Sequence, residues 1–464
     1  MKKNGFTFIE ILGVITLLAL MSIIVLMVVD KSLKNSKSTL SDVQIENIKS
    51  AASMWRTDNI EYIPESGYYI LSLGDLINNG YINDVIDPNS QSNYDSSILV
   101  GVGNSNIIVG KEADDYVSTL YGCNNTTVFC IKDRSDMEKL AEEVIGGDNK
   151  SGKTYKLIKN IDLGGKFDSD GNPLEGNNPW TPIGSGTKPF SGTFDGAGHI
   201  ITGMYIDSTK NAAGLFRVVS GGTIKNLGIE DSYVKSSLEY SGVFAGQIVS
   251  DSSVLNCYNG GTVSGQKFTG GIIGTANNST IKNSYNFGSV ISDYKQFAGG
   301  IVSYGSSSLI ENCYNSGSIL YGYEIGGIAG GGALQIRNTY NVGNVNSSNY
   351  NVRGGIIGQL YVDGIVQNSY NSGDLGSSYK GGIVGNIYQN KNQQLINNYY
   401  LNTTASYGIF RSTNDSFESY SDNGTAPLSA GEMPSVISVI NGDDAFVPDT
   451  KGINNGYPIL SWQQ

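Results

Sequence analysis

The chain has 464 residues, 39% of them apolar, which is enough for two or three domains that each bury a core. Its 61 glycines and only 16% charged residues indicate many turns and little surface helix, so a mainly β protein is expected. The formal net charge of -12 argues against nucleic acid as a partner, because phosphate binding needs clustered Lys and Arg.

An apolar run close to the N-terminus extends from Phe6 to Val29. As a helix it would be about 36 Å long, enough to cross a hydrocarbon core of about 30 Å. It is too long for the apolar part of a secretory signal peptide, and no Ala-x-Ala-like cleavage site ends it. Lys2 and Lys3 favour a cytoplasmic N-terminus. The run therefore predicts a single-pass membrane segment, and Glu10 within it needs a partner.

The residues from Lys2 to Gly5, followed by Phe6-Thr7-Phe8-Ile9-Glu10, resemble the leader of type IV pilins and pseudopilins. The resemblance implies a leader at 1–5 that a prepilin peptidase removes after Gly5, and a methylated Phe6 as the new first residue. It also implies that Glu10 directs assembly by meeting the Phe6 amine of another pilin subunit. A plain signal anchor is the alternative.

After Asp30, apolar residues continue at intervals that fit one face of a helix, so the assembly helix at 6–29 is expected to run on to about Asn59: Leu33, Leu40, Val43, Ile48, Ala52 and Trp55. The resemblance implies that this helix packs on a small α+β pilin head at 30–116. The protein would lie in the cell membrane before assembly and on an extracellular pilus or the cell surface afterwards.

A junction and cap follow at residues 117–150. Cys123 and Cys130 enclose only six residues, so a disulfide between them is sterically easy, and two unpaired thiols are the alternative. Ser135 and Glu138 have the spacing of a capping box, which predicts a short helix through about Ile145. We expect this helix to cap the next domain.

Internal repetition decides the fold of residues 151–464. Seven Gly-apolar-apolar phrases, the first at Gly214 and the last at Gly382, recur at intervals of 28, 29, 29, 27, 28 and 27 residues. One repeat cannot bury its own apolar face, so the copies must stack. The pattern predicts a right-handed parallel β-helix of about ten turns.

Stacked turns would align equivalent side chains into ladders. A second phrase in each repeat ends in Asn and, from its second copy on, continues with a small residue and Tyr. One predicted ladder contains Asn256, Asn283, Asn312, Asn338, Asn368 and Asn398, and the other contains Tyr258, Tyr285, Tyr314, Tyr340, Tyr370 and Tyr400. Cys257 and Cys313 would lie two turns and about 9–10 Å apart, so both are predicted to be free, with their orientation left open.

These repeats resemble the GLUG motif of bacterial surface proteins, and the stretch from Asn160 to Gly196 resembles the lead-in of such domains. The resemblance covers about residues 117–464 and implies the fold. It says little about activity, because such repeats occur in adhesins, in exoproteins and beside IgA-cleaving metallopeptidases. The ending from Asn455 to Trp462 resembles the close of the same domains and is expected to seal the last turn.

The sequence offers few groups for catalysis. His199 is the one histidine, so neither a His-Glu-x-x-His zinc site nor a serine triad with a nucleophile elbow can be assembled. Asp168, Asp170 and Asn172 offer oxygen ligands at alternate positions, but the Gly and Glu that an EF-hand loop needs are missing, which favours a simple turn over a Ca²⁺ site. No catalytic residue and no cofactor are predicted.

Tyrosine is frequent, at 29 copies, and many copies fall outside the predicted ladder. Exposed aromatic rings on a long face suit an extracellular glycan or protein ligand, although Tyr also fills turns of this fold. The predicted ligand face contains Tyr294, Tyr304, Tyr321, Tyr323, Tyr350, Tyr361, Tyr379 and Tyr388. The sequence thus predicts a minor type IV pilin or pilin-like surface protein that displays a β-helix adhesin. A pilin-anchored carbohydrate-active enzyme and a structural spacer are the alternatives.

Overall fold

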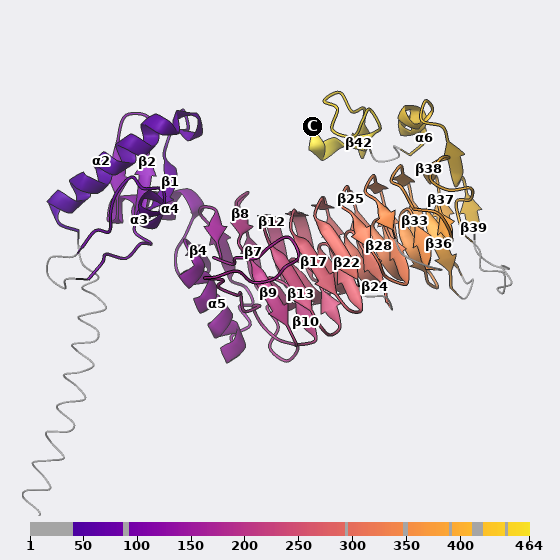
Figure 1. The fold of residues 1–464 in the computed structure, drawn as a ribbon, viewed down its shortest axis with the longest axis horizontal. Coiled ribbons are helices and arrows are strands. Elements are labelled where there is room, and N and C mark those ends of the chain that lie inside the picture. The colour runs from indigo at the N-terminus through magenta and orange to yellow at the C-terminus, as the bar shows by residue number, and fades with distance from the viewer. Residues whose placement is uncertain are drawn as a thin grey trace, which may run out of the picture. The chain divides into compact units, whose positions relative to one another are not determined.

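The structure is a computed structural model, and it describes residues 40–86, 92–292, 296–346, 351–388, 392–410, 421–440 and 444–464 (Figure 1). The chain divides into two compact units, Met1–Tyr116 and Val117–Gln464. The predicted leader and assembly residues Gly5, Phe6 and Glu10 lie outside the described residues.

The first unit packs one helix on a small antiparallel sheet. Helix α2 (Asp42–Asp58) buries Ile48, Ala51, Ala52 and Trp55 against this sheet. The sheet has the order β1 (Tyr69–Ser72), β2 (Leu99–Val102) and β3 (Ile107–Val109). The short helix α3 (Leu73–Asn78) follows β1, and α4 (Lys111–Tyr121) follows β3.

The prediction of one long helix running to about Asn59 is wrong. Ser41 has extended backbone (φ -69°, ψ 155°), and its N–H donates to Oε1 of Gln44 (3.0 Å), so α2 begins at Asp42. It packs on the sheet with one face only, and its outer face is mostly polar but also exposes Val43 and Met54. Between residue 40 and the C-terminus, gaps aside, no helix is long and apolar enough to cross a membrane. The predicted single-pass anchor therefore has no support in the structure.

The second unit is a parallel β-solenoid of about ten turns, as the repeat predicted (Figure 1). A seven-stranded sheet forms one side: β10 (Ala212–Ala213), β14 (Tyr240–Ser241), β18 (Phe268–Gly270), β23 (Ala298–Gly299), β27 (Glu324–Gly326), β31 (Val352–Gly354) and β35 (Lys380–Gly381). A six-stranded sheet forms another: β9 (Tyr205–Ser208), β13 (Tyr233–Ser236), β17 (Thr262–Gly265), β22 (Ser289–Ser292), β26 (Ile319–Leu320) and β30 (Val345–Asn346).

The remaining solenoid strands belong to one 24-stranded sheet with two limbs joined at a corner. Its first limb has β11 (Phe216–Ser220), β15 (Ala245–Val249), β19 (Ile273–Asn277), β24 (Val302–Glu311), β28 (Ala329–Arg337), β32 (Ile357–Leu360) and β36 (Val384–Ile387). Its second limb has β12 (Thr223–Ile229), β16 (Ser253–Asn259), β20 (Thr280–Lys282), β21 (Tyr285–Asn286), β25 (Tyr314–Asn315), β29 (Tyr340–Asn341), β33 (Ile365–Gln367), β34 (Tyr370–Asn371), β37 (Gln394–Ile396), β38 (Tyr399–Leu401), β39 (Ser421–Asn423) and β40 (Ala426–Leu428). The long strands β24 and β28 span both limbs.

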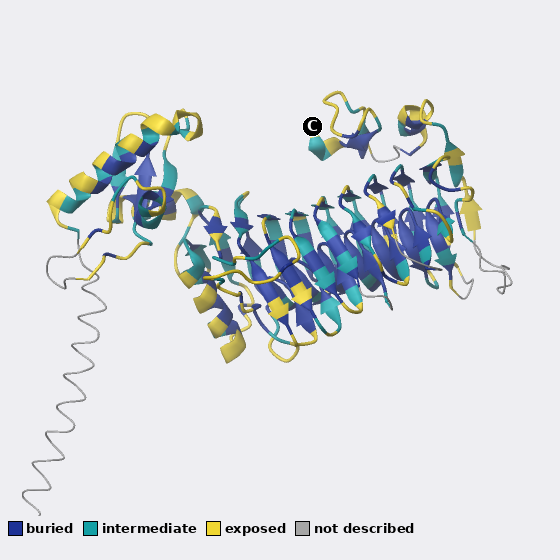
Figure 2. Ribbon diagram, viewed as in Figure 1, coloured by how far each residue is buried: buried dark blue, intermediate teal, exposed yellow. Residues whose placement is uncertain are grey.

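The N-terminal end of the solenoid is closed by a helix. The first turns contain β4 (Val128–Ile131), β5 (Thr154–Leu157), β6 (Ile161–Asp162), β7 (Thr193–Asp195) and β8 (Ile200–Thr202). Helix α5 (Arg134–Gly146) buries Met137, Leu140 and Val144 in the solenoid core and leaves its other face exposed (Figure 2). Its N-cap is Asp133, not the predicted Ser135.

Paired glycines set the corner between the seven-stranded sheet and the first limb. A Cβ on Gly299 would lie 2.1 Å from the carbonyl oxygen of Val302, and one on Gly300 would lie 2.4 Å from Cγ of Asn315. Both distances are far below any van der Waals contact, so these positions exclude every larger residue. The Gly-Gly pairs of the repeat follow from this tight corner.

The predicted ladder of asparagines forms a corner within the second limb, where β20 ends and β21 begins. Its members have left-handed backbone (φ 49–54°), and each side-chain amide donates to the Asn one turn before at 2.9–3.4 Å. The first, Asn226, donates to Oδ1 of Asp195 at 3.0 Å. The last is Asn397 rather than the predicted Asn398, because Gln367 pairs with Ile396.

A second ladder of asparagines, which the sequence reasoning missed, runs through the interior. Asn259, Asn286, Asn315, Asn341 and Asn371 are all fully buried, and each of the first four donates to the Oδ1 of the next at 2.7–2.8 Å. The same amides also donate to backbone carbonyl oxygens within their own turns, as Asn315 does to Gly317 (2.9 Å). The ladder ends at Thr404.

The tyrosine ladder is present between these two rows. The rings of Tyr258, Tyr285, Tyr314, Tyr340 and Tyr370 stack with centroids 4.8–5.2 Å apart. The next member is Tyr399, not the predicted Tyr400, since the register pairs Tyr370 with Tyr399. Cys257 and Cys313 are free and buried, because the left-handed Asn before each one turns the side chain inward. Burial raises the pKa of both thiols to about 12.

The C-terminal segment lies along this ladder instead of sealing the last turn. It contains a 3₁₀ turn (Met433–Val436), α6 (Ile437–Ile440) and the hairpin of β41 (Phe446–Val447) and β42 (Ile459–Leu460). The Trp462 ring lies 5.9 Å from those of Tyr285 and Tyr314, and its Nε1–H donates to the Asn312 carbonyl oxygen (3.1 Å). The chain end thus covers the middle of the tyrosine ladder with a small apolar core of its own.

Candidate functional site

A second group of aromatic rings lies on the outside of the solenoid, beside the glycine corner. The six residues, here called the aromatic cluster, are Tyr240, Phe268, Phe297, Tyr304, Tyr361 and Tyr388. They come from turns between β14 and the end of β36, and the turn with β27 and β28 contributes Glu324 and Gly331 in place of rings. The strand register positions them, because outward side chains of stacked turns form columns along the solenoid.

Two such columns meet at the corner. One precedes the glycine pairs on the seven-stranded sheet and runs through Tyr240, Phe268, Phe297 and Glu324. The other follows the first limb: Gln247 pairs with Thr275, Thr275 with Tyr304, Tyr304 with Gly331, Gly331 with Gln359 and Gln359 with Asn386. Gly331 lies below a ring, since a Cβ there would be 2.5 Å from Cε1 of Phe297.

The rings contact one another in sequence along the axis. Phe268 stacks on Tyr240 (centroids 5.4 Å apart) and on Phe297 (5.8 Å). Tyr304 packs against Phe297 (5.1 Å) and meets Tyr361 edge to face at 5.6 Å. Tyr361 then contacts Tyr388 at 4.8 Å. Such contacts fix the ring orientations, and Tyr388 remains 41% exposed at the end of the cluster.

Polar groups accompany the rings. Gln247 donates to Oγ1 of Thr275 at 3.4 Å. The Gln359 side chain makes no hydrogen bond to any residue that the structure describes, and Oδ1 of Asn386 is buried without a partner there. An unpaired buried acceptor is costly, so a hydroxyl donor that reached Oδ1 of Asn386 would be bound favourably.

Glu324 is the one carboxylate of the two columns. It lies on β27 between Phe297 of the preceding turn and Val352 of the next. Burial raises its pKa to about 7, and its charge contributes to the raised pKa of Tyr361. No described residue forms a hydrogen bond or ion pair with its side chain.

The structure separates the predicted ligand face into several parts. Tyr304, Tyr361 and Tyr388 come together in the aromatic cluster. Tyr321 and Tyr323 are exposed between β26 and β27, and Tyr379 packs edge to face on Phe410 (5.4 Å). Tyr294 and Tyr350 lie outside the described residues.

Three cluster members were missed from the sequence. Tyr240, Phe268 and Phe297 each precede the repeat's glycines by two residues, as Tyr379 does. This regular position was the available signal. The predicted ligand face contained only Tyr, which left out Phe268 and Phe297, and Tyr240 stands out only when the residues that precede the glycines are compared between repeats.

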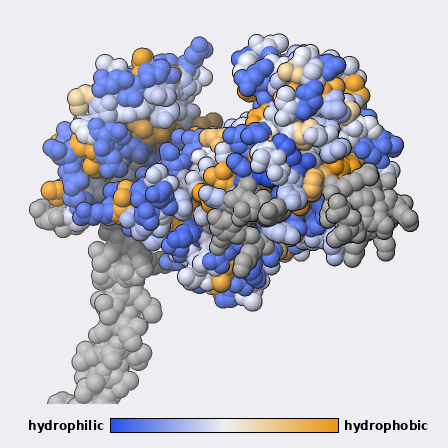
Figure 3. Space-filling view, turned by 45° about the vertical axis from the view of Figure 1, so that its right-hand side comes forward, coloured by the Kyte–Doolittle hydropathy of each residue, from blue (hydrophilic) through white to orange (hydrophobic). Residues whose placement is uncertain are grey.

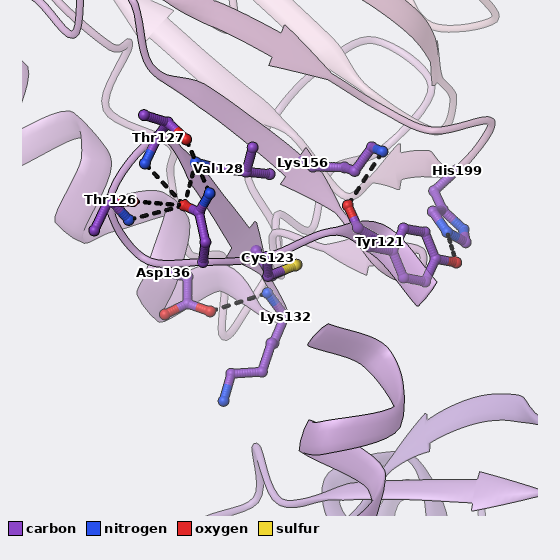
Figure 4. The surroundings of a disulfide bond; sticks show 11 residues. Tyr121, Cys123, Thr126, Thr127, Val128, Lys132, Asp136, Lys156 and His199 are labelled. Atoms are coloured by element: carbon purple, nitrogen blue, oxygen red, sulfur yellow. Dashed lines mark hydrogen bonds between the residues drawn. A yellow bond between two sulfur atoms is a disulfide. The ribbon is translucent and has the colours of Figure 1, made fainter. Parts of the chain in front are cut away.

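Cys123 and Cys130 form a disulfide with Cα atoms 5.7 Å apart (Figure 4). Within the loop that it closes, Oδ1 of Asn124 accepts from the backbone N–H groups of Thr126, Thr127 and Val128 at 2.9–3.0 Å. His199 meets the Tyr121 hydroxyl at 3.1 Å, and burial lowers the pKa of its imidazole. These contacts explain His199 as a structural residue of the first turns.

Asp168, Asp170 and Asn172 form a turn. One carboxylate oxygen of Asp168 accepts from the backbone N–H groups of Asp170 (3.0 Å) and Asn172 (2.8 Å), and the other accepts from the Asn172 amide (3.0 Å). The hydrogen bonds from Asn172 lower the pKa of Asp168. Over the residues described, no three His, Cys, Asp or Glu side chains gather as metal ligands would.

The structure therefore defines a mainly β protein with a parallel β-solenoid that carries an aromatic and amide-bearing outer face. No protein-family model matches the chain. Halomucin of Haloquadratum walsbyi is 34% identical over 126 residues, which is 26% of this chain and 1% of that protein. A protein of Evansella cellulosilytica, described as a Gly-rich membrane protein, is 34% identical over 85 residues, 18% of this chain and 9% of its own length.

Two solved structures are similar to the solenoid. One, described as an immunoglobulin A1 protease from Bacteroides ovatus, is 23% identical and covers 74% of this chain and 94% of its own, with a TM-score of 0.44. The other, titled IgA1 Protease, is 16% identical and covers 69% of this chain and 25% of its own, with a TM-score of 0.45. The expected membership in the type IV pilins is wrong: the helices of the described residues are short, and none of them is the long apolar helix that the resemblance implied.

Proposed function

We propose that the solenoid is a binding module whose aromatic cluster takes a glycan. The cluster itself is the observation that supports this function: six rings in mutual contact on one outer face, with the unpaired amide groups of Gln359 and Asn386 beside them. Aromatic faces stack on the apolar faces of sugar rings, and side-chain amides bind hydroxyl groups.

The composition of the surface agrees with a polar ligand. In the face drawn in Figure 3, hydrophobic residues form small separate patches among hydrophilic ones. A sugar polymer lying along the solenoid could contact equivalent columns in successive turns.

The test is a glycan binding screen on the full-length chain, with the length of each polymer followed in the same wells. Saturable binding is expected without shortening of the polymer. Tyr361→Ala should weaken binding by roughly five- to tenfold, because one stacked ring contributes about 1 kcal/mol. Tyr407→Ala is the control, since Tyr407 is 68% exposed and lies outside the cluster.

Two results would contradict the proposal. If both Tyr variants bind as the parent does, the ligand does not use the cluster. If polymers shorten in a manner that depends on the protein, the chain is a carbohydrate-active enzyme instead. Circular dichroism of each variant separates lost binding from lost folding.

A further inference from the structure

We infer that Glu324 makes the aromatic cluster selective for a glycan that carries positively charged amino groups. This inference rests on the proposed function and names the substrate class of the same site. The observation behind it is the placement of a carboxylate among aromatic rings in a column whose other members near it are apolar.

The surroundings of Glu324 are unusual for a carboxylate. Its neighbours in the column are Phe297 and Val352, and its negative charge is one of the causes that raise the pKa of the Tyr361 phenol. Partly buried carboxylates normally have a cation or several N–H donors beside them. Glu324 has none from the residues that the structure describes, and burial raises its pKa, which disfavours the ionised form.

A cationic ligand would stabilise that form. A cationic nitrogen beside the carboxylate is attracted by its negative charge even where it carries no N–H group, and the faces of Phe297, Tyr304 and Tyr361 attract the same positive charge. A neutral sugar gains only the stacking. The net charge of -12 increases the encounter rate with any polycation, so a test must separate this long-range attraction from the local contact.

The experiment compares two glucosamine pentamers that share one backbone. In one, all nitrogens are N-acetylated and neutral, and in the other they are trimethylated, so that their charge does not depend on pH. Titration calorimetry with the full-length chain at pH 8 should show tighter binding of the cationic pentamer. Glu324→Gln removes the negative charge beside the cation, so it should cost about tenfold or more of that affinity and leave the neutral pentamer unaffected.

Glu175→Gln is the matched control, because Glu175 is exposed and its removal changes the net charge by the same amount. It should leave both affinities unchanged. For the parent chain, affinity for the cationic pentamer should rise about tenfold from pH 6 to pH 8, since the ionised fraction of a carboxyl with a pKa of about 7 increases about tenfold. The phenols of Tyr304 and Tyr361 face the same region, but burial raises their pKa, so they stay neutral.

Failure of this inference can be told from failure of the glycan proposal. Equal binding of both pentamers, or a cationic preference that Glu324→Gln and Glu175→Gln reduce alike, would overturn the role of Glu324 and leave glycan binding intact. Binding of a lysine pentamer as tight as that of the cationic glycan, and equally dependent on Glu324, would overturn the sugar assignment. Binding of neither pentamer would overturn the inference, and the wider screen would then decide the proposed function.

Discussion

Replacing Asn315 by Asp tests whether the internal asparagine ladder holds the turns together. The change keeps the shape of the side chain and exchanges its amide nitrogen for oxygen. In the parent chain that nitrogen donates to the carbonyl of Gly317 (2.9 Å) and to Oδ1 of Asn341 (2.8 Å). Asp would place an acceptor against two acceptors at a fully buried position.

Each acceptor that loses its donor in a buried site costs about 1–3 kcal/mol, so we expect Asn315→Asp to lower the free energy of unfolding by about 2–6 kcal/mol at pH 8. The effect should be smaller at pH 5. Burial raises the pKa of the new carboxyl in the folded state, so the folded protein binds the proton more tightly than the unfolded chain. Its stability is therefore higher below the folded pKa and falls as the pH rises through it.

Asn312→Asp in the corner ladder is the matched control. Its amide donates to Asn283 (3.2 Å), but the site is partly exposed, so water can replace the lost donor and the cost should stay below about 1 kcal/mol. Urea unfolding followed by circular dichroism at both pH values gives the comparison. Equal destabilisation by the two variants, or an Asn315→Asp effect that does not change with pH, would refute the role assigned to the interior ladder.

Three further predictions concern the cover, the thiols and the glycine corner. Trp462→Ala should lower the melting temperature and increase binding of a hydrophobic dye, because the Trp462 ring covers the tyrosine ladder. Trp462→Phe should behave almost as the parent, and equal dye binding by the two variants would show that the ladder does not need this ring as a cover. Cys257 and Cys313 should react with a thiol reagent only after denaturation, and the thiols of Cys123 and Cys130 should appear only after reduction of their disulfide. Rapid labelling of the native chain would contradict the burial of Cys257 and Cys313. Gly300→Ala should abolish or severely reduce folding, because the glycine corner has no room for a Cβ atom. Gly186→Ala, at an open position, should leave the melting temperature unchanged, and a stable Gly300→Ala protein would show that the corner can relax.

The solenoid could be predicted because its repeats constrain one another. A phrase that returns every 27 to 29 residues must stack, and stacking alone places Tyr258 above Tyr285. The direction of Cys257 was left open, because it depends on the left-handed backbone of Asn256, which the structure shows. The same logic failed at the last copy. Two consecutive asparagines, Asn397 and Asn398, fit the phrase equally well, and only the strand register shows that the first continues the ladder.

The interior asparagines were missed for a different reason. Asn286 and Asn315 follow the ladder tyrosines as regularly as the corner asparagines precede them, but a polar residue is normally assigned to the outside. Burial becomes favourable only because each amide finds its partner one turn away, which a single repeat cannot show. The C-terminal segment that covers the tyrosine ladder could not be predicted from a single repeat either. Trp462 belongs to no repeat, and its contact with Asn312 joins residues that are 150 positions apart.

The candidate site depends both on the repeat pattern and on residues that differ from one turn to the next. Its columns follow from the repeat, but their chemistry depends on which residue each turn places there, so Glu324 differs from Phe297 without any change of backbone. Because the interior ladder fixes the register of these turns, the rings are held before a ligand arrives, and binding should cost little conformational entropy. Ring substitutions such as Tyr361→Ala should then weaken binding at nearly constant stability. If affinity and stability instead fell together in every ring variant, ligand binding would be coupled to ordering of the turns, and the preformed site argued here would be wrong.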